Sequence, residues 1–282
     1  MIALSTNDKQ QLKRIGITEQ QIEQQINIFK KGFAYSNLTA AATLEKGIIR
    51  FTDDEIESLV NQFDEDKEYY DIIKFVPASG AASRMFKSLY SFIDEYKDKD
   101  IPDNFLKKDK IKPDSVENFF LGIRHFAFFE DLRKDLAKKG KDIEEMLKNN
   151  ELVEIAEDLL NPEGLSYGKL PKALLKFHNY DNYSRYAIEE HLVEAAQYST
   201  ITSEKGVIAQ VHFTVSKEHL PLFQNTIDKL LPKYEKMFNV KYKITYSEQK
   251  PSTDTIAVDL NNKPFRDKNG ELVFRPGGHG AL

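Results

Sequence analysis

The segment IIKFVPASGAASRM, residues 72–85, sets the topology that we expect for this chain. Most side chains from Ile72 to Val76 are β-branched or aromatic, which favours a short strand. Residues 77–82 are all small or rigid, and such a run favours a tight loop. From Arg84 onward apolar side chains recur at helical spacing, so a helix should follow. The segment therefore predicts a strand, a small-residue loop and a helix, the geometry of a phosphate cradle.

The chemistry of this loop suits an anion. Small residues let the backbone approach a ligand, and the first free N–H groups of a helix point toward it. Arg84 lies where its planar guanidinium could grip phosphate oxygens. The loop has neither the Gly-x-x-x-x-Gly-Lys-[Ser/Thr] pattern nor the Gly-x-Gly-x-x-Gly pattern, so neither of those nucleotide-binding loops is supported. Taken alone, the small-residue run favours a plain strand-to-helix turn, and Arg84 in the first helical turn is what favours phosphate binding.

Strands and helices alternate in the second half of the chain. Residues 207–215 and 240–246 are rich in Val, Ile, Phe and Tyr and are expected to be strands. Residues 186–196 and 218–238 have helical periodicity. This alternation predicts an α/β fold with a parallel, doubly wound sheet. Turn signals near the end predict short antiparallel strands over residues 256–260 and 271–274.

Sequence patterns in the first third of the chain and in a later insertion predict helices. Thr18 with Gln21, and Thr52 with Glu55, form capping-box patterns ahead of amphipathic stripes. We therefore expect an N-terminal helical segment over residues 1–67 and an α/β core over residues 68–282. A helical insertion, about residues 97–165, should interrupt that core, with one long helix from Asp114 to near Gly140.

Composition excludes several classes of protein. The 282 residues carry 40 Lys plus Arg and 45 Asp plus Glu, a net charge of −5, which argues against nucleic acid as the main partner. The absence of Cys removes disulfides, thiolate catalysis and Cys-based metal sites. There is no apolar run long enough to cross a membrane and no signal pattern at the start, so we expect a cytoplasmic protein without membrane contact.

Residues 76–85 resemble the signature loop of the nucleotidyltransferases that join a nucleoside triphosphate to a sugar phosphate. Ala82 stands where that family usually has a second glycine. Three later segments resemble further elements of the family in the expected order. They are Leu170-Pro171-Lys172, the segment from Gln249 to Ala257, and Pro276-Gly277-Gly278-His279-Gly280. The whole chain also resembles a bacterial family of uncharacterised proteins, the DUF4301-like chains.

The resemblance implies a Rossmann-like, doubly wound mixed sheet of the nucleotide-diphospho-sugar transferase type. It implies nucleotidyl transfer, with UTP as the expected triphosphate, a sugar phosphate as the acceptor, and Mg²⁺. Arg84 and Lys172 would be the catalytic cations, and Gln249 would read a pyrimidine base. The nucleotide-binding residues implied by the resemblance are Ala78, Ser79, Gly80, Ala81, Ala82, Gln249, Gly277, Gly278 and His279.

Several points stay open at the level of sequence. A catalytically inactive nucleotide-binding or nucleotide-sugar-binding regulatory protein on the same fold is the alternative function. The metal ligands are not identified, because surface turns explain Asp254 and Asp259 equally well. In the resembled family an acidic ligand comes from a later strand, so we expect that part of the core follows Leu282. The sequence indicates neither the sugar nor the oligomeric state.

Overall fold

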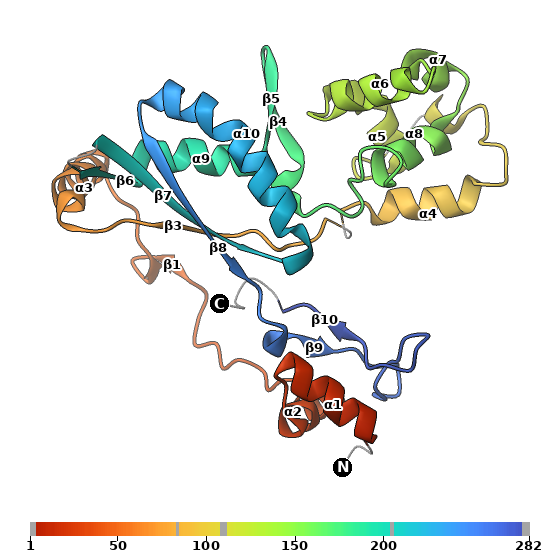
Figure 1. Ribbon diagram of the computed structural model, residues 1–282, viewed down its shortest axis with the longest axis horizontal. Coiled ribbons are helices and arrows are strands. Elements are labelled where there is room, and N and C mark those ends of the chain that lie inside the picture. The colour runs from red at the N-terminus through yellow and green to blue at the C-terminus, as the bar shows by residue number, and fades with distance from the viewer. Residues whose placement is uncertain (1–3, 83–84, 108–111, 204–205, 278–282) are drawn as a thin grey trace. The chain divides into compact units, whose positions relative to one another are not determined.

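The computed structural model describes residues 4–82, 85–107, 112–203 and 206–277. The chain forms two compact units (Figure 1), one from Ile73 to Glu248 and the other from Met1–Ile72 together with Gln249–Leu282. The first boundary thus lies at Ile72, near the expected one after residue 67. The C-terminal segment groups with the N-terminal helices instead of continuing the α/β core.

The unit from Ile73 to Glu248 is built on a mixed sheet. Its strands are β3 (Lys74–Pro77), β6 (Thr200–Ser203), β7 (Gly206–Val215) and β8 (Lys241–Glu248). Strand β7 pairs in parallel with β3 on one edge and with β8 on the other, so that Phe213 lies between Val76 and Tyr246. Strand β6 forms an antiparallel hairpin with the start of β7. The three predicted strands are therefore present and parallel.

Two helices cover one face of this sheet, α9 (Ala187–Tyr198) and α10 (Leu220–Phe238) (Figure 1). Alternate residues of β7 point to opposite faces. Val211 and Phe213 are fully buried against Ile188 of α9 and Phe223 of α10. This packing produces the mixed α/β architecture that the alternating pattern predicts.

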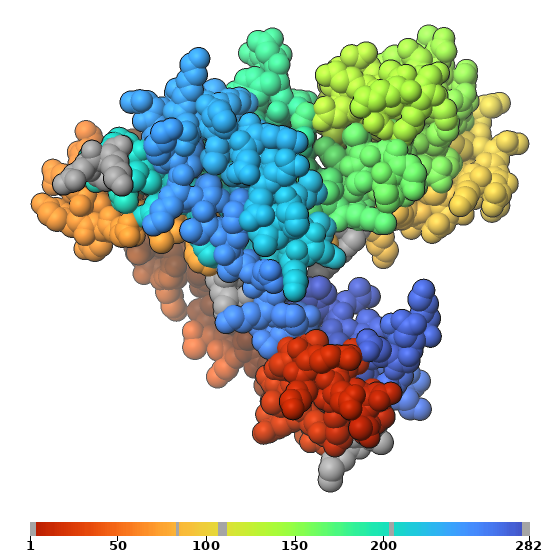
Figure 2. All heavy atoms as spheres, in the orientation of Figure 1, coloured from red at the N-terminus to blue at the C-terminus, as the bar shows by residue number. Residues whose placement is uncertain are grey.

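The rest of this unit is helical, and its atoms are coloured yellow to green in Figure 2. Its helices are α4 (Lys87–Tyr96), α5 (Val116–Leu121), α6 (Phe129–Lys138), α7 (Ile143–Lys148) and α8 (Leu152–Leu160), and they share one apolar core. A 3₁₀ turn, η4 (Lys172–Leu174), leads to a hairpin of β4 (Lys176–Tyr180) and β5 (Tyr183–Tyr186).

The prediction of one long helix from Asp114 to near Gly140 is wrong. Helix α5 begins after Ser115 and ends at Gly122, and a 3₁₀ turn leads to α6. The 3₁₀ turn Ile123–His125 separates α5 from α6, while Phe120 and Phe128 on either side of it enter the same core. Similarly, α4 begins at Lys87 after a turn at residues 85–86, not at Arg84.

The other unit packs N-terminal helices against C-terminal strands. It contains α1 (Thr6–Ile15), α2 (Glu19–Lys31), β1 (Thr43–Leu44), β2 (Gly47–Ile48), α3 (Asp53–Asp66), β9 (Thr255–Ile256) and β10 (Phe274–Arg275). Both predicted capping boxes are present, at Thr18 and at Thr52. The predicted antiparallel pairing of the C-terminal strands is also present, with Phe274 opposite Ile256. Helix α1 has its own capping box from Ser5 and Asp8, which the sequence analysis missed.

Glutamine amides join these helices to the strand edges. Gln11 of α1 exchanges two hydrogen bonds with the backbone of Leu272, at 2.8 and 2.9 Å. Gln25 of α2 accepts from the backbone N–H of Ile256 at 2.9 Å. Each bond satisfies a backbone group that a short strand would otherwise leave unpaired. Among the described residues, no helix has both the length and the apolar character that a membrane span requires.

A buried ion pair anchors α1. The Asp8 carboxylate is 2% exposed and accepts two bonds from Arg266, at 2.7 and 2.9 Å. It also accepts from the backbone N–H of Ser5. The Arg266 guanidinium, followed by the Ser5 bonds, holds the pKa of Asp8 well below its usual range, although burial opposes this.

We expect Asp8→Asn to lower the free energy of unfolding by about 2 kcal/mol at pH 7, because it removes a helix-capping charge and a charged pair. A depressed folded pKa stabilises the protein above the unfolded pKa of about 4 and loses this contribution as the pH falls toward the folded value. Urea unfolding of wild type and variant should therefore converge as the pH is lowered from 7 to 3. Glu271→Gln, which breaks an exposed pair with Arg14, is the control and should change little at either pH.

Candidate functional site

The small-residue loop after β3 is hydrogen-bonded to a distant segment of the chain. Gly80 accepts a bond from the backbone N–H of Lys172 at 3.0 Å, and Ala81 forms an isolated antiparallel bridge with Pro171. Ala78 donates to the carbonyl of Thr214 in β7 at 2.8 Å, which fixes the start of the loop on the sheet. The structure therefore brings together two segments that the sequence analysis assigned to one site.

The loop presents backbone donors. Among the interactions of the described residues, no partner accepts from the backbone N–H groups of Ser79, Gly80 and Ala81. Ser79 and Gly80 are partly exposed and Ala81 is exposed. Unpaired N–H groups on a tight loop are suited to hold an anion such as a phosphate.

Ala82 lies in the apolar core and not on the open side of the loop. It is fully buried and belongs to the same cluster as Phe86 and Leu89. Its methyl group therefore packs inward, where a glycine would leave a gap. The alanine at this position anchors the end of the loop and does not fill the space beside its exposed backbone.

Lys172 is exposed beside this loop, at the start of η4. The next two residues, Ala173 and Leu174, are buried in the sheet core and hold the turn in place. Among the described residues, no carboxylate forms an ion pair with Lys172. The loop thus has an unpaired cation as a neighbour. The other predicted cation, Arg84, lies outside the described residues.

The C-terminal parts of the predicted site contact one another within the other unit. Gln249 donates from its side-chain nitrogen to the carbonyl of Gly277 at 2.5 Å, and Gly277 donates to Asp254 at 3.0 Å. A Cβ at Gly277 would lie 2.7 Å from the Thr253 hydroxyl, so only glycine fits there. Gly278 and His279 lie outside the described residues.

The small-residue loop leaves the sheet at the carboxyl end of β3. Pro77, which precedes the loop, pairs with Thr214, and Glu248, which precedes Gln249, pairs with Val215. All these strands are parallel, so their carboxyl ends share one edge of the sheet. Ligands of open α/β sheets bind outside this edge.

The carboxylates that the sequence left open as Mg²⁺ ligands, Asp254 and Asp259, both bond to backbone N–H groups. No group of three or more His, Asp or Glu side chains in the described part of the chain is arranged to hold a metal ion. Asp254 accepts from Gly277, and Asp259 accepts from the backbone N–H groups of Asn261 and Lys263 at 2.8 and 2.9 Å. Asp259 thus closes a surface turn.

Sequence reasoning missed a buried charge cluster between the β4–β5 hairpin and α9. Arg185 is 8% exposed, and its guanidinium donates to Glu190 at 2.9 Å. The Arg185 guanidinium carbon lies 4.5 Å from the ring centre of Tyr180 and 5.3 Å from that of Tyr183. Among the described residues, Nε of Arg185 has no hydrogen-bond partner.

Glu190 is the centre of this cluster. It also accepts from the Tyr180 hydroxyl at 2.7 Å, and His178 lies at 3.0 Å. Burial raises the pKa of Glu190, but the bonds from Tyr180, Arg185 and His178 outweigh burial and leave it lowered. The sequence signal was the Asp181-Asn182 pair flanked by Tyr180 and Tyr183, a turn signal between aromatic residues that is typical of a hairpin.

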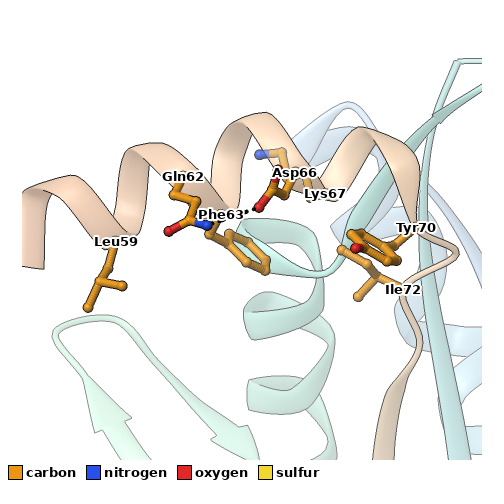
Figure 3. Close-up of a pocket in the computed structure, with 7 residues that line it drawn as sticks. All are labelled: Leu59, Gln62, Phe63, Asp66, Lys67, Tyr70 and Ile72. Atoms are coloured by element: carbon orange, nitrogen blue, oxygen red, sulfur yellow. Dashed lines mark hydrogen bonds between the residues drawn. The ribbon is translucent and has the colours of Figure 1, made fainter.

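A surface groove lies on α3, in the unit that contains the N-terminus (Figure 3). It has a volume of about 410 Å³, and Leu59, Phe63 and Tyr70 line it together with Gln62 and Asp66. Its ionisable side chains are on the surface, and Lys67 pairs with Asp64 at 2.6 Å. This groove offers apolar contact and no arrangement of groups for chemistry.

We expect Glu190→Gln to lower the free energy of unfolding by about 3 kcal/mol, because the variant leaves the buried Arg185 charge without its counter-charge. Urea unfolding at pH 7 measures this loss. The double variant Arg185→Leu with Glu190→Leu should recover part of it. The control, Glu130→Gln, breaks an exposed pair with Arg133 and should leave stability almost unchanged. Equal effects of the two Glu→Gln variants would contradict this account.

Comparison with known proteins gives one match. No curated protein and no solved structure matches this chain. The family described as "Domain of unknown function (DUF4301)" matches residues 5–282, which is nearly the whole chain and includes both units. We conclude that the chain belongs to the DUF4301 family.

Proposed function

We propose that this chain is a nucleotidyltransferase that joins a nucleoside triphosphate, UTP in the first place, to a sugar phosphate with release of pyrophosphate. The single observation that carries the proposal is the contact of Gly80 and Ala81 with Pro171 and Lys172. Two segments that resemble elements of one enzyme family, and that are far apart in the sequence, are hydrogen-bonded in space. Unrelated turns would have no reason to meet.

The charges around the loop support triphosphate binding. The N–H groups of Ser79, Gly80 and Ala81 would donate to phosphate oxygens. The Lys172 ammonium lies on the segment bonded to this loop and would neutralise a second phosphate group. Arg84 follows the loop in the sequence and would add a planar guanidinium.

In the proposed reaction a phosphate oxygen of the sugar phosphate attacks the α-phosphorus of the triphosphate. A new bond forms between that oxygen and the α-phosphorus, and the bond to the oxygen that bridges the α- and β-phosphorus atoms breaks. The leaving pyrophosphate takes the bonding electron pair. Negative charge accumulates on the non-bridging oxygens, and fixed cations and N–H groups stabilise it. Proton transfer by a side chain is not required.

The proposal extends to fold and base recognition. The parallel strands β3, β7 and β8 would be the core of a nucleotide-diphospho-sugar transferase sheet, with the nucleotide at their carboxyl ends. Gln249 would use its amide oxygen on a pyrimidine, because its amide nitrogen already donates to Gly277. Mg²⁺ would arrive with the triphosphate. A cytoplasmic location would give access to both substrates.

The second candidate is a regulatory protein that binds a nucleotide or nucleotide sugar without turnover. The hydrogen bond from the Gln249 amide nitrogen to Gly277 favours it. Both candidates require nucleotide binding at the loop, and only the first requires pyrophosphate release. A measurement of nucleotide binding and a measurement of pyrophosphate release therefore distinguish the two candidates.

We expect UTP with Mg²⁺ to raise the Tm of the full chain by a few degrees at a concentration about 100 times its Kd, because such binding adds about 2.7 kcal/mol of stability. Thermal shift against UTP, dTTP, CTP, GTP and ATP measures binding and base preference. A flat response to every nucleotide would remove both candidates.

We expect Lys172→Ala to lower the rate of pyrophosphate release by about 10²- to 10³-fold, as removal of one preorganised charge does elsewhere. Arg84→Ala should have an effect of the same order. Because the Lys172 side chain is exposed, the Tm without ligand should not change. Lys169→Ala, which removes a nearby exposed lysine, is the matched control and should retain the wild-type rate. If wild type binds UTP but releases no pyrophosphate with any sugar 1-phosphate, the regulatory candidate replaces the enzyme.

A further inference from the structure

The unit from Ile73 to Glu248 contains a cavity of about 590 Å³ in its helical part. The first turn of α4, the start of α5, the turn before α6 and strand β4 surround it. This volume falls in the range of small-molecule sites, which are mostly apolar with a few placed polar groups. The cavity is separate from Lys172 and Gln249, which do not line it.

Six Phe and Tyr side chains line the cavity, namely Phe86, Phe119, Phe126, Phe128, Phe177 and Tyr167. The rings of Phe126 and Phe128 are nearly parallel, 5.2 Å apart with an angle of 8° between them. Phe126 keeps 40% of its surface exposed and Phe177 keeps 42%. Phenylalanines that only fill a core are closed off from solvent, whereas these two line the cavity and remain partly exposed.

The polar groups of the wall favour a ligand that donates hydrogen bonds and disfavour an anion, because the exposed Asp114 carboxylate also lines the cavity. The charge of Lys176 is already compensated by Asp131 at 2.6 Å. Asn118 and Asn179 use their amide nitrogens on the carbonyls of Pro113 and His125, each at 2.8 Å. Among the interactions of the described residues, neither amide oxygen of these two asparagines accepts a hydrogen bond, so both can accept from a ligand.

We propose that this cavity binds a neutral, planar aromatic molecule that carries an N–H or O–H donor. Aromatic walls pack well against flat rings, and the asparagine oxygens would take the donor. Phe86, which follows the phosphate-binding loop by a few residues, lines the cavity. This site goes beyond the proposed transfer reaction and does not depend on it.

The test uses the full chain and N-phenyl-1-naphthylamine, a neutral planar probe with one N–H donor that fluoresces strongly in apolar sites. We expect saturable binding with one site per chain. The charged analogue 1-anilinonaphthalene-8-sulfonate has the same rings and should bind at least about tenfold more weakly, because no free cation lines the cavity among the described residues. Octanol, which is neutral but not aromatic, should not displace the probe. Tight binding of the sulfonate or displacement by octanol would overturn the assignment of the ligand class.

Two variants test whether the probe binds in this cavity. Ser88→Trp places a large ring in the cavity from α4, and Phe177→Ala removes an open aromatic wall; each should weaken probe binding about tenfold. The matched control is Phe63→Ala, which removes a phenylalanine of similar exposure, 44%, from the groove on α3. Wild-type affinity in Phe177→Ala, or loss of affinity in Phe63→Ala, would overturn the proposal. If Ser88→Trp does not fold, the comparison of Phe177→Ala with Phe63→Ala still decides.

Discussion

Strand β7 is the constraint on which the larger unit depends. Its backbone pairs on both edges, in parallel with β3 and with β8, and its inward side chains are fully buried. A central strand of this kind cannot shift by one residue without moving every apolar side chain to the opposite face. The register therefore fixes where β3 and β8 end. The small-residue loop and Gln249, which follow those ends, take their starting points from it.

The loop owes its second anchor to tertiary structure. The backbone N–H of Lys172 bonds to the Gly80 carbonyl, and the next two residues, Ala173 and Leu174, are buried in the sheet core. Ala82 contributes from the other side by packing in the helical core. Thus both apolar cores of this unit hold the loop, one at each end. Between these two anchors lie Ser79, Gly80 and Ala81, and no partner among the described residues accepts from their backbone N–H groups.

Buried charges in this protein lie at junctions between elements. Asp8 with Arg266 joins α1 to the C-terminal segment, and Arg185 with Glu190 joins the hairpin to α9. A buried pair costs desolvation, so it adds little net stability over an apolar pair. Removing either partner, however, lowers the free energy of unfolding strongly, because the other charge is then buried alone. The pair therefore favours one arrangement of the chain over alternatives that would bury a single charge. Neither pair touches the proposed phosphate-binding loop.

Local pattern was enough to predict many elements. Thr18 and Thr52 cap the N-termini of their helices by accepting hydrogen bonds from nearby backbone N–H groups. A few residues are therefore enough to predict where these helices begin. The break at Gly122 was missed because Phe119, Phe120 and Phe126 keep apolar spacing across it. The Arg185 cluster was missed because its side chains come into contact only in the folded chain. The periodicity of a sequence does not indicate which distant side chains are in contact.

Local pattern alone predicts strands β3 and β7 and the small-residue loop, because each depends on neighbouring residues. Three contacts could be seen only in the folded chain: Pro171 and Lys172 lie against Gly80 and Ala81, the Ala82 methyl group packs in the core, and Gln249 contacts Gly277. These facts depend on how the chain closes on itself over long separations. The physical reason is that contact is set by packing and register, which the chain reaches only when every element is in place.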